Sequence, residues 1–306
     1  MPDAAQNSVS NKTTQIAFQG APGCYGQLAG HLFCKLKTDL CPISMPGQND
    51  SIGYTPCKTF DEVVKNVVEG DVDFGVLPLD NSSVGMNLRA FELLTDRQVA
   101  MLADLYLPIQ LHLIGLPGAE EDKISRVISH PMALKQCKRF FVEKKHIEPR
   151  PYWDTAGACF FIKRQNNPEY AAIAGEAAAQ AAGLTVLRWN LEDFKENETR
   201  YGIIAQIPRA MNYVQENFPE NPRLSCSVEL DADKHDLTRF LSQAVGPYEA
   251  EVFNVLSFPI PQNPWTYVHI LELDLSSAKE TQTVWTKIRE TALRARILGI
   301  YDSLKP

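Results

Sequence analysis

The sequence predicts an α/β protein of two lobes, followed by a smaller α+β domain. Through the first two thirds of the chain, short apolar runs alternate with segments of helical periodicity. A second set of such units interrupts the first before the pattern returns, and after residue 224 strands and helices follow in a different order. Alternating strands and helices favour a sheet covered by helices, and an interrupted series favours two lobes with a cleft between them.

Length and composition narrow the function. At 306 residues the chain exceeds the usual size of one domain, so two domains or lobes are expected. The net charge of −7, without any basic run, argues against a nucleic-acid partner, although a small anion could bind in a locally positive cleft. No apolar run is long enough to cross a bilayer, so no membrane association is expected.

The cysteines and the first residues indicate the compartment. The seven cysteines are scattered and include no Cys-x-x-Cys pair, which is typical of a reduced cytosolic protein rather than of a disulfide framework or a zinc site. Residues 1–14 are polar and lack the apolar segment of a signal peptide, so they are expected to form a disordered tail. We therefore expect a cytoplasmic protein without a metal site.

A glycine-rich turn joins the first strand to the first helix. Residues 15–19 predict a strand, residues 20–23 a turn that glycine makes easily, and residues 25–36 a helix. The amides at a helix N-terminus point outward and can bind an anion. The turn has neither glycine pattern of the nucleotide-binding loops, so this signal is weak by itself.

The next strand, over residues 73–79, ends in a polar cluster at residues 80–85. Open α/β sheets bind ligands at such strand ends, although an ordinary turn with a helix cap favours the same residue types. Thr59 and Glu62 have the spacing of a capping box. The other elements expected here are a helix from Thr59 through Val68, an irregular insertion over 37–54 and a helix over 87–95.

The middle of the chain predicts the second lobe. Residues 99–115 form a long extended segment that could cross between lobes. His130-Pro131 can begin a helix, since proline is tolerated in the first turn, and Asp154 or Thr155 can cap another. The other elements expected here are a strand over 123–129, helices through 142 and from 155, a strand over 170–174, a helix over 175–182, and a segment over 184–189 that returns to the first lobe.

The sequence Asn-Glu-Thr-Arg-Tyr at residues 197–201 precedes an apolar run that predicts a buried strand. Thr199 offers a hydroxyl, and Arg200 offers a planar donor fork suited to a carboxylate. An alternative interpretation is that Thr199 is only a strand former and Arg200 a solvated charge. The spacing alone favours this second interpretation.

The C-terminal part predicts a ferredoxin-like domain, because its strands and helices follow in the order βαββα. Such a domain is more often a regulatory or assembly module than a catalytic one. The elements are strands over 225–230, 252–258 and 266–275, and helices over 236–245 and 278–295.

Taken together, the polar segments at the strand ends resemble the prephenate and arogenate dehydratase family. The similarity extends over about residues 16–303. The residues of these segments are more similar to those of the plant-type arogenate dehydratases than to those of the bacterial bifunctional enzymes. Five motifs that occur in the family's order are specific evidence for the resemblance, whereas any single motif would not be. They are FQGAPGCY at 18–25, GVLPLDNSSVG at 75–85, SHPMALKQC at 129–137, DTAGA at 154–158 and NETRY at 197–201.

The resemblance implies two catalytic lobes similar to type II periplasmic binding proteins, followed by an ACT domain that senses phenylalanine. The implied catalytic region covers residues 15–215, with residues 15–105 and 190–215 in lobe one and 106–189 in lobe two. The implied ACT domain covers residues 222–306. A homodimer or homotetramer with a small-molecule substrate is expected.

The family's reaction removes a ring hydroxyl as water and the ring carboxylate as carbon dioxide, which leaves an aromatic ring. Aromatisation drives the reaction, so no metal or organic cofactor is needed. The protein must orient the dianion and assist the departing hydroxyl. The resemblance implies that Thr199, Asn81 and Asp80 have catalytic roles. Thr199 is the residue that would assist the departure of the ring hydroxyl. It also implies that Arg200 binds the substrate's carboxylates. The full set of implied substrate-binding residues is Arg200, Ser82, Ser129, Gln136, Thr155, Gly23 and Tyr25.

Several positions depart from the family pattern. Tyr201 stands where Phe is usual, Asp80 where Glu is usual, Gly26 where Ser or Thr is usual, and Met132 where Gln is common. The segments that bind phenylalanine in relatives are replaced here by KHDL at 234–237 and LSFP at 256–259, so weak or absent phenylalanine binding is expected. The corresponding regulatory candidates are Asp236, Leu237 and Ser257.

Two alternative functions stay open. One is a prephenate decarboxylase that does not aromatise the ring, which Thr199 argues against but Gly26 and Asp80 leave open. The other is a non-catalytic ligand-binding paralogue that uses the same cleft. The choice between prephenate and arogenate also stays open, because it depends on one keto or amino substituent.

Overall fold

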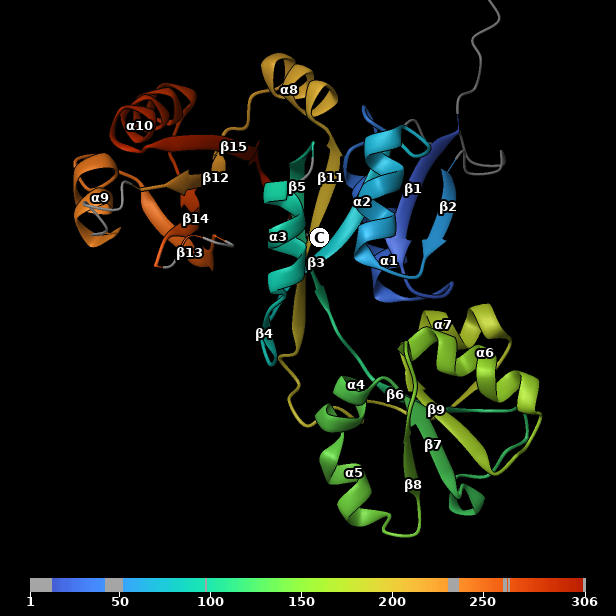
Figure 1. Ribbon diagram of the computed structural model, residues 1–306. Coiled ribbons are helices and arrows are strands. Elements are labelled where there is room, and N and C mark those ends of the chain that lie inside the picture. Colours follow the sequence, from blue (N-terminus) through green and yellow to red (C-terminus); the bar gives the residue numbers. More distant parts are fainter. Residues whose placement is uncertain are drawn as a thin grey trace, which may run out of the picture.

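The computed structural model describes residues 13–41, 52–96, 98–230, 237–260, 263 and 265–304. The described strands form two sheets, one of eleven strands and one of five. Figure 1 shows the smaller sheet in a separate lobe with its own helices, while the larger sheet continues from the other lobe into the C-terminal region.

Lobe one is built on the strand order β5-β11-β3-β1-β2. β1 pairs in parallel with β2 and β3, whereas β11 runs antiparallel to both β3 and β5. Helices α1 and α2 bury their apolar residues in different clusters, so the sheet is covered on both faces. Its strands are β1 (Thr14–Gln19), β2 (Ile52–Cys57), β3 (Phe74–Asn81), β4 (Gly85–Met86), β5 (Val99–Pro108) and β11 (Glu198–Gln206). Its helices are α1 (Tyr25–Leu36), α2 (Phe60–Glu69), α3 (Leu88–Asp96) and α8 (Ile207–Glu216).

Lobe two contains the five-stranded sheet, in the order β10-β6-β9-β7-β8. The chain enters it after Pro108 and re-enters lobe one at Glu198. Its strands are β6 (His112–Gly115), β7 (Arg126–Ser129), β8 (Glu148–Pro151), β9 (Tyr170–Ala174) and β10 (Thr185–Arg188). Its helices are the 3₁₀ turn η1 (Glu121–Lys123), α4 (Pro131–Gln136), α5 (Lys138–Glu143), α6 (Thr155–Gln165) and α7 (Glu176–Ala182).

The C-terminal region has an antiparallel sheet in the order β13-β14-β12-β15, with α9 and α10 packed together on one side. This is the strand order of a ferredoxin-like fold. Its elements are β12 (Arg223–Glu229), α9 (Leu237–Ala244), β13 (Glu251–Pro259), β14 (Tyr267–Asp274), α10 (Ala278–Thr291), β15 (Arg294–Tyr301) and β16 (Ser303–Leu304).

The C-terminal sheet joins the sheet of lobe one along β5. β15 pairs with β5 at Gly299 and Met101, and β16 pairs with it at Asp104 and Leu105. Ile270, Leu298 and Tyr301 also lie in the buried cluster of lobe one that contains α2 and α3. The two regions therefore share a sheet and part of a core.

Capping interactions explain where several helices begin. The Thr59 side chain accepts a hydrogen bond from Glu62 N, which confirms the predicted N-cap, while Glu62 Oε2 accepts one from Lys58 N. Asp154 caps α6 by accepting from Gly157 N over 2.7 Å. These side chains satisfy backbone N–H groups that have no partner inside the helix.

Five predicted elements differ from the observed ones. The segment over 184–189 was expected to lead back to lobe one, but β10 pairs with β6 and completes the second sheet. The helix expected through 295 ends at Thr291, and β15 follows it. β2 begins at Ile52, near the end of the insertion expected to be irregular over 37–54, and continues to Cys57; the helix expected over 130–142 is divided at Cys137. Thr14 belongs to β1 rather than to the tail, of which residues 1–12 lie outside the described residues.

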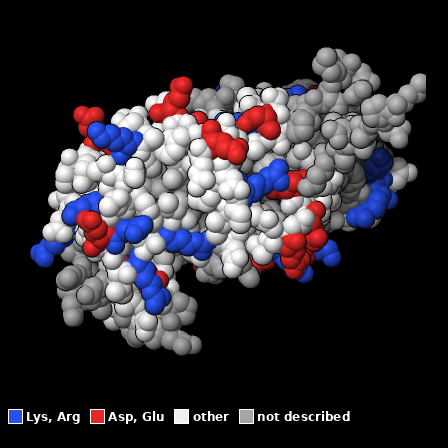
Figure 2. Space-filling view, turned by 90° about the horizontal axis from the view of Figure 1, so that it is seen from above, with Lys and Arg blue, Asp and Glu red and all other residues white. Residues whose placement is uncertain are grey.

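Acidic and basic side chains are interspersed on the face of the molecule that Figure 2 presents. Among the described residues, no helix has both the length and the apolar character needed to cross a membrane.

Candidate active site

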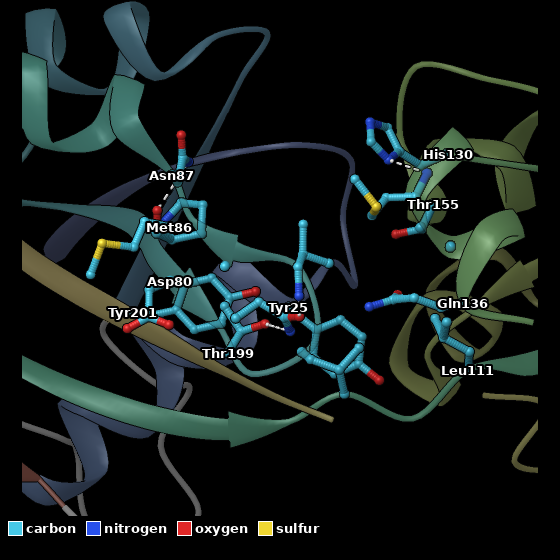
Figure 3. Close-up of a pocket in the computed structure, with 17 residues that line it drawn as sticks. Tyr25, Asp80, Met86, Asn87, Leu111, His130, Gln136, Thr155, Thr199 and Tyr201 are labelled. Carbon is cyan, nitrogen blue, oxygen red and sulfur yellow. Dashed lines mark hydrogen bonds between the residues drawn. The ribbon is translucent and has the colours of Figure 1, made fainter. Parts of the chain in front are cut away.

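A cleft of about 500 Å³ lies between the two lobes. This volume is in the range of small-molecule sites. Figure 3 shows Thr199, Asp80, Met86 and Tyr201 of lobe one on one side of the cleft, and residues of lobe two on the other. The lining residues named below include His130, Gln136 and Thr155 of lobe two and Tyr25, Asp80, Asn81, Met86, Asn87, Thr199 and Tyr201 of lobe one.

Thr199 and Asn81 form the centre of the lobe-one wall. They lie opposite each other on the antiparallel strands β11 and β3. Asn81 Nδ2 donates a hydrogen bond to Thr199 Oγ1 over 2.8 Å. Thr199 is largely buried, with 8% of its surface exposed, so its hydroxyl is held in place at the cleft wall.

The orientation of the Asn81 amide is fixed by its neighbours. Its Oδ1 accepts hydrogen bonds from Ser83 N and Val84 N, both at 3.0 Å. Backbone N–H groups can only donate, so the amide oxygen must face them and the NH₂ group must face Thr199. The Thr199 oxygen is therefore an acceptor toward Asn81, and its own hydrogen can be donated to Tyr201 or to a ligand in the cleft.

Asp80 is the only Asp or Glu among the described residues that line the cleft. Burial raises its pKa above the usual value; Arg200 opposes this shift, and the carboxylates of Glu272 and Asp104 add to it. Asp80 lies opposite Arg200 on the neighbouring strand. A carboxyl with a raised pKa beside the cleft can exchange protons more readily near neutral pH than an ordinary aspartate.

Gln136 and Thr155 provide polar groups from lobe two. Gln136 Nε2 donates to Ser83 Oγ over 2.7 Å, so it bridges the two lobes at the edge of the cleft. Thr155 is the first residue of α6, where backbone amides point out of the helix. Asp154 Oδ2 accepts from Ala21 N over 2.9 Å in addition to capping α6, which ties the start of this helix to lobe one.

Tyr25 lies where the chain crosses between the lobes. Its hydroxyl donates to Gln110 O and accepts from Gln110 N over 2.9 Å. Burial raises the pKa of Tyr25 to about 12, with the backbone of Gln110 lowering it and Glu192 raising it. Tyr25 lines the cleft as a protonated phenol whose hydroxyl already has two partners.

Arg200 does not reach the cleft. Its side chain has no exposed area and pairs with Asp104 and Glu272 on the face of β11 that is opposite Thr199. Successive side chains of a strand point to opposite faces, so Thr199 and Arg200 cannot share one. The prediction that Arg200 binds a substrate carboxylate is therefore wrong, and so is the alternative that it is a solvated charge.

Three further predicted binding residues lie outside the described cleft lining. Ser129 is fully buried, and its hydroxyl donates to Ile173 O over 2.6 Å within the smaller sheet. Ser82 Oγ donates to Glu196 O and accepts from Glu198 N, so it closes the loop before β11. Gly23 has a φ of +82°, and a Cβ there would lie 2.6 Å from the backbone of α7. These three positions shape the surroundings of the cleft.

The described lining contains no Lys or Arg side chain. An anionic ligand would therefore meet amides, hydroxyls and helix N-termini rather than a guanidinium. His130, Met86, Asn87 and Tyr201 line the cleft but were not predicted as site residues. His130 follows a strand directly, which was an available signal. No cluster of three or more His, Cys, Asp or Glu in the described part of the chain could hold a metal ion.

The regulatory candidates are only partly described. Asp236 lies outside the described residues, and Leu237 begins α9. Ser257 Oγ lies 2.8 Å from His269 Nδ1 on the neighbouring strand. Leu256 and Phe258 of the same strand pack against the buried cluster of lobe one.

Comparisons with known sequences and structures each match this chain to proteins named as prephenate or arogenate dehydratases. A family model described as prephenate dehydratase matches residues 16–209. A bifunctional chorismate mutase/prephenate dehydratase of Buchnera aphidicola is 26% identical over 95% of this chain and 71% of its own length. An Arabidopsis thaliana protein, arogenate dehydratase/prephenate dehydratase 6, is 30% identical over 68% of this chain, which spans 47% of that relative. The crystal structure of the prephenate dehydratase of Arthrobacter aurescens in complex with L-Phe superposes with a TM-score of 0.77 at 20% identity, covering 94% of this chain and 90% of that one.

Proposed function

The chain belongs to the prephenate dehydratase family, and we propose that its cleft removes water and carbon dioxide from prephenate or arogenate to form an aromatic ring. Membership of the family assigns it to phenylalanine biosynthesis as a carbon–oxygen lyase. The two-lobed fold has the cleft that such a substrate requires. The reaction proposed for this chain is thus a dehydration coupled to loss of the ring carboxylate.

The hydrogen bond from Asn81 to Thr199 is the observation that carries this proposal. Because Thr199 accepts from Asn81, its hydroxyl hydrogen can be directed at the ring hydroxyl that leaves. A hydrogen bond or proton given to a departing hydroxide lowers the barrier to cleavage of its bond to the ring carbon. Thr199 is the donor in this scheme, and Asn81 sets its direction.

The substrate's carboxylates are proposed to bind neutral donors. Tyr25 begins α1 and Thr155 begins α6, and both residues line the cleft. The N-terminus of α6 already holds the carboxylate of Asp154, whereas no side chain of the N-cap residue bonds to α1, so α1 is the better anion site. Helix N-termini carry partial positive charge and stabilise anions. Gln136 adds an amide from lobe two, and these groups can orient the ring without a guanidinium.

Asp80 is proposed to assist in the proton balance of the same step. Its pKa is raised, first by burial, so it can carry a proton closer to neutral pH than an ordinary aspartate. The departing hydroxide must gain a proton to leave as water. Asp80 and Thr199 line the same cleft, which allows both to contribute.

A two-substrate assay tests the proposal. The protein is incubated with prephenate or arogenate, and phenylpyruvate or phenylalanine is measured together with carbon dioxide. Equal formation of aromatic product and carbon dioxide is expected with one of the substrates. Carbon dioxide without aromatic product would instead indicate a non-aromatising decarboxylase, and no turnover of either substrate would indicate a ligand-binding protein.

We also propose the domain limits, the oligomeric state and the cellular location of the protein. The domain limits proposed are residues 15–215 for the catalytic region and 222–306 for an ACT-like domain, which would support a homodimer or homotetramer. A cytoplasmic location is supported by the seven cysteines, all of which are buried and unpaired. Size-exclusion chromatography with light scattering measures the oligomeric state.

A further inference from the structure

The guanidinium of Arg200 joins lobe one to the C-terminal region. Its Nε donates to Asp104 Oδ2 of β5 over 2.7 Å, and its Nη1 donates to Glu272 Oε2 of β14 over 2.8 Å. A second bond, from Nη2 to the other oxygen of Glu272, makes this pair bidentate. None of the three side chains is exposed. The residue next to Thr199 is thus bound to a carboxylate of another region.

We propose that Arg200 is a positioning residue, and that its ion pair with Glu272 lets the C-terminal region hold β11 so that Thr199 meets the substrate. The inference rests on the proposed function, because it takes Thr199 as the donor to the departing hydroxyl. It extends that function by giving Glu272, which does not line the cleft, a part in catalysis.

The geometry of β11 explains why this ion pair acts on Thr199. Arg200 and Thr199 are consecutive residues with side chains on opposite faces, so a shift of one moves the other. The register between β11 and β3 changes between Arg200 and Tyr201, which interrupts the regular ladder at this point. The pairing of β11 with β5 stays regular over the same residues, so the irregularity is confined to the β3 side. The buried side chain of Arg200 adds a second, side-chain link that fixes the strand at this point.

The cluster around this ion pair is closed and charge-compensated. Arg223 Nη1 donates to Asp104 Oδ2 over 3.1 Å, and Tyr301 OH donates to Glu272 Oε1 over 3.0 Å. Burial alone would raise the pKa of Glu272, but the hydrogen bonds and charge of Arg200 lower it below the usual value. A buried pair of this kind has one favoured arrangement, because displacing either partner leaves a charge without compensation.

The cluster also reaches the cleft through side chains. Asn254 Nδ2 donates to Glu272 Oε2 over 3.0 Å and lies 3.8 Å from the sulfur of Met86. Met86 lines the cleft, and so does Asp80, which lies opposite Arg200 across the ladder. A change at Glu272 is therefore transmitted to two parts of the cleft wall.

The test compares Glu272→Gln with Asp274→Asn in the full-length protein. Both remove one carboxylate charge from the same face of β14, but Asp274 binds Arg223 and makes no bond to Arg200. For Glu272→Gln we expect kcat to fall about 10- to 100-fold with KM changed less than about threefold, because a displaced catalytic group loses rate rather than ground-state binding. Asp274→Asn is expected to stay within about threefold of the wild type. Amide hydrogen exchange of residues 198–202 should be faster in Glu272→Gln and unchanged in Asp274→Asn.

A folded Glu272→Gln protein with unchanged kcat and unchanged exchange in β11 would overturn the inference. An increase in KM alone would also overturn it, because that result would indicate substrate binding rather than positioning. If the wild type itself converts neither substrate, the proposed function fails, and the exchange measurement alone decides whether Glu272 holds β11.

A second variant covers the case in which Glu272→Gln does not fold. The double substitution Arg200→Met with Glu272→Met removes both charges together, and apolar replacements of a buried ion pair are often tolerated. The same fall in kcat is expected, since the link to the C-terminal region is absent. Full activity in this folded double variant would overturn the inference.

Discussion

Asn81 and Thr199 are 118 residues apart in sequence, yet the amide of one donates to the hydroxyl of the other over 2.8 Å. The direction of this hydrogen bond is set by the turn after β3, whose backbone N–H groups occupy the Asn81 oxygen. Reversing that direction should therefore redirect the Thr199 hydroxyl without changing the size of the side chain.

Asn81→Asp makes this reversal. A carboxylate oxygen in place of Nδ2 accepts the Thr199 hydrogen, so the hydroxyl can no longer donate into the cleft. We expect kcat to fall by at least about 100-fold, at the lower end of what general acid assistance contributes. Steady-state kinetics give the result, with Asn87→Asp as a control that adds the same charge to the cleft but has no bond to Thr199. An equal loss of kcat in both variants would attribute the effect to charge alone.

Thr199→Ala should lower turnover far more than substrate binding. A hydroxyl that assists a departing group acts mainly in the transition state, so kcat is expected to fall about 10²- to 10⁴-fold. Thr199→Ser keeps the hydroxyl and should recover most of the activity. Burst and steady-state rates with substrate in excess measure both variants, and an active Thr199→Ala protein would remove Thr199 from the mechanism.

Asp154→Ala should reduce the free energy of unfolding by about 2 kcal/mol. Loss of an N-cap costs about 1 kcal/mol, and loss of the hydrogen bond to Ala21 N costs about the same. Asp154→Asn should cost less, because asparagine is also a good cap. Urea denaturation followed by circular dichroism measures the three proteins. Equal stability of Asp154→Ala and the wild type would show that this carboxylate does not tie the lobes together.

The pH dependence of stability should report the ion pair of Glu272. Although burial raises its pKa, the bonds to Arg200 bring the folded-state value below the usual 4.5. The unfolded chain then takes up the proton first as the pH falls. The stabilisation is complete above about pH 4.5 and is lost as the pH falls through the lower, folded-state pKa.

The comparison of wild type with Glu272→Gln isolates this effect. The variant should be less stable at pH 7, and the difference should shrink as the pH is lowered below about 4.5. Denaturant midpoints between pH 3 and pH 7 provide the measurement. A difference that grows toward low pH would contradict the assignment.

Phenylalanine is expected to bind weakly or not at all. Leu256 and Phe258 stand where relatives are expected to have residues that bind the amino acid, and here both side chains pack against the core of lobe one. An amino acid's charged groups would meet apolar surroundings there. Isothermal titration with phenylalanine, together with activity in its presence, checks this expectation. Micromolar affinity coupled to inhibition would contradict it.

Much of the fold could be predicted because local patterns determine it. The capping box at Thr59 and Glu62 and the strand over Tyr170–Ala174 match the expected elements. β10 and β15 could not be assigned in the same way, because the formation and pairing of a strand depend on tertiary packing as well as on its own residues. The helix before β15 also lacks a glycine or proline stop, which concealed its end.

The candidate site was only partly predictable for a different reason. The motifs identified which residues come close to the cleft but not which way each side chain points. Thr199 and Arg200 are neighbours on one strand, so the period of two already implies that only one of them enters the cleft. Ser129 could not be excluded from the predicted binding residues in this way. Its hydroxyl donates a hydrogen bond to the carbonyl of Ile173, 44 residues further along the chain, and this contact depends on the tertiary fold.

The pairing of β16 with β5 has a consequence for synthesis of the protein. Ser303 and Leu304, which cover that edge of β5, are synthesised nearly two hundred residues after Asp104 and Leu105. Until then the nascent lobe presents an unpaired strand edge, and the buried carboxylate of Asp104 lacks its bond from Ser303. This edge of the lobe-one sheet can therefore be completed only after β16 has been made, and until then it is open to non-native strand pairing.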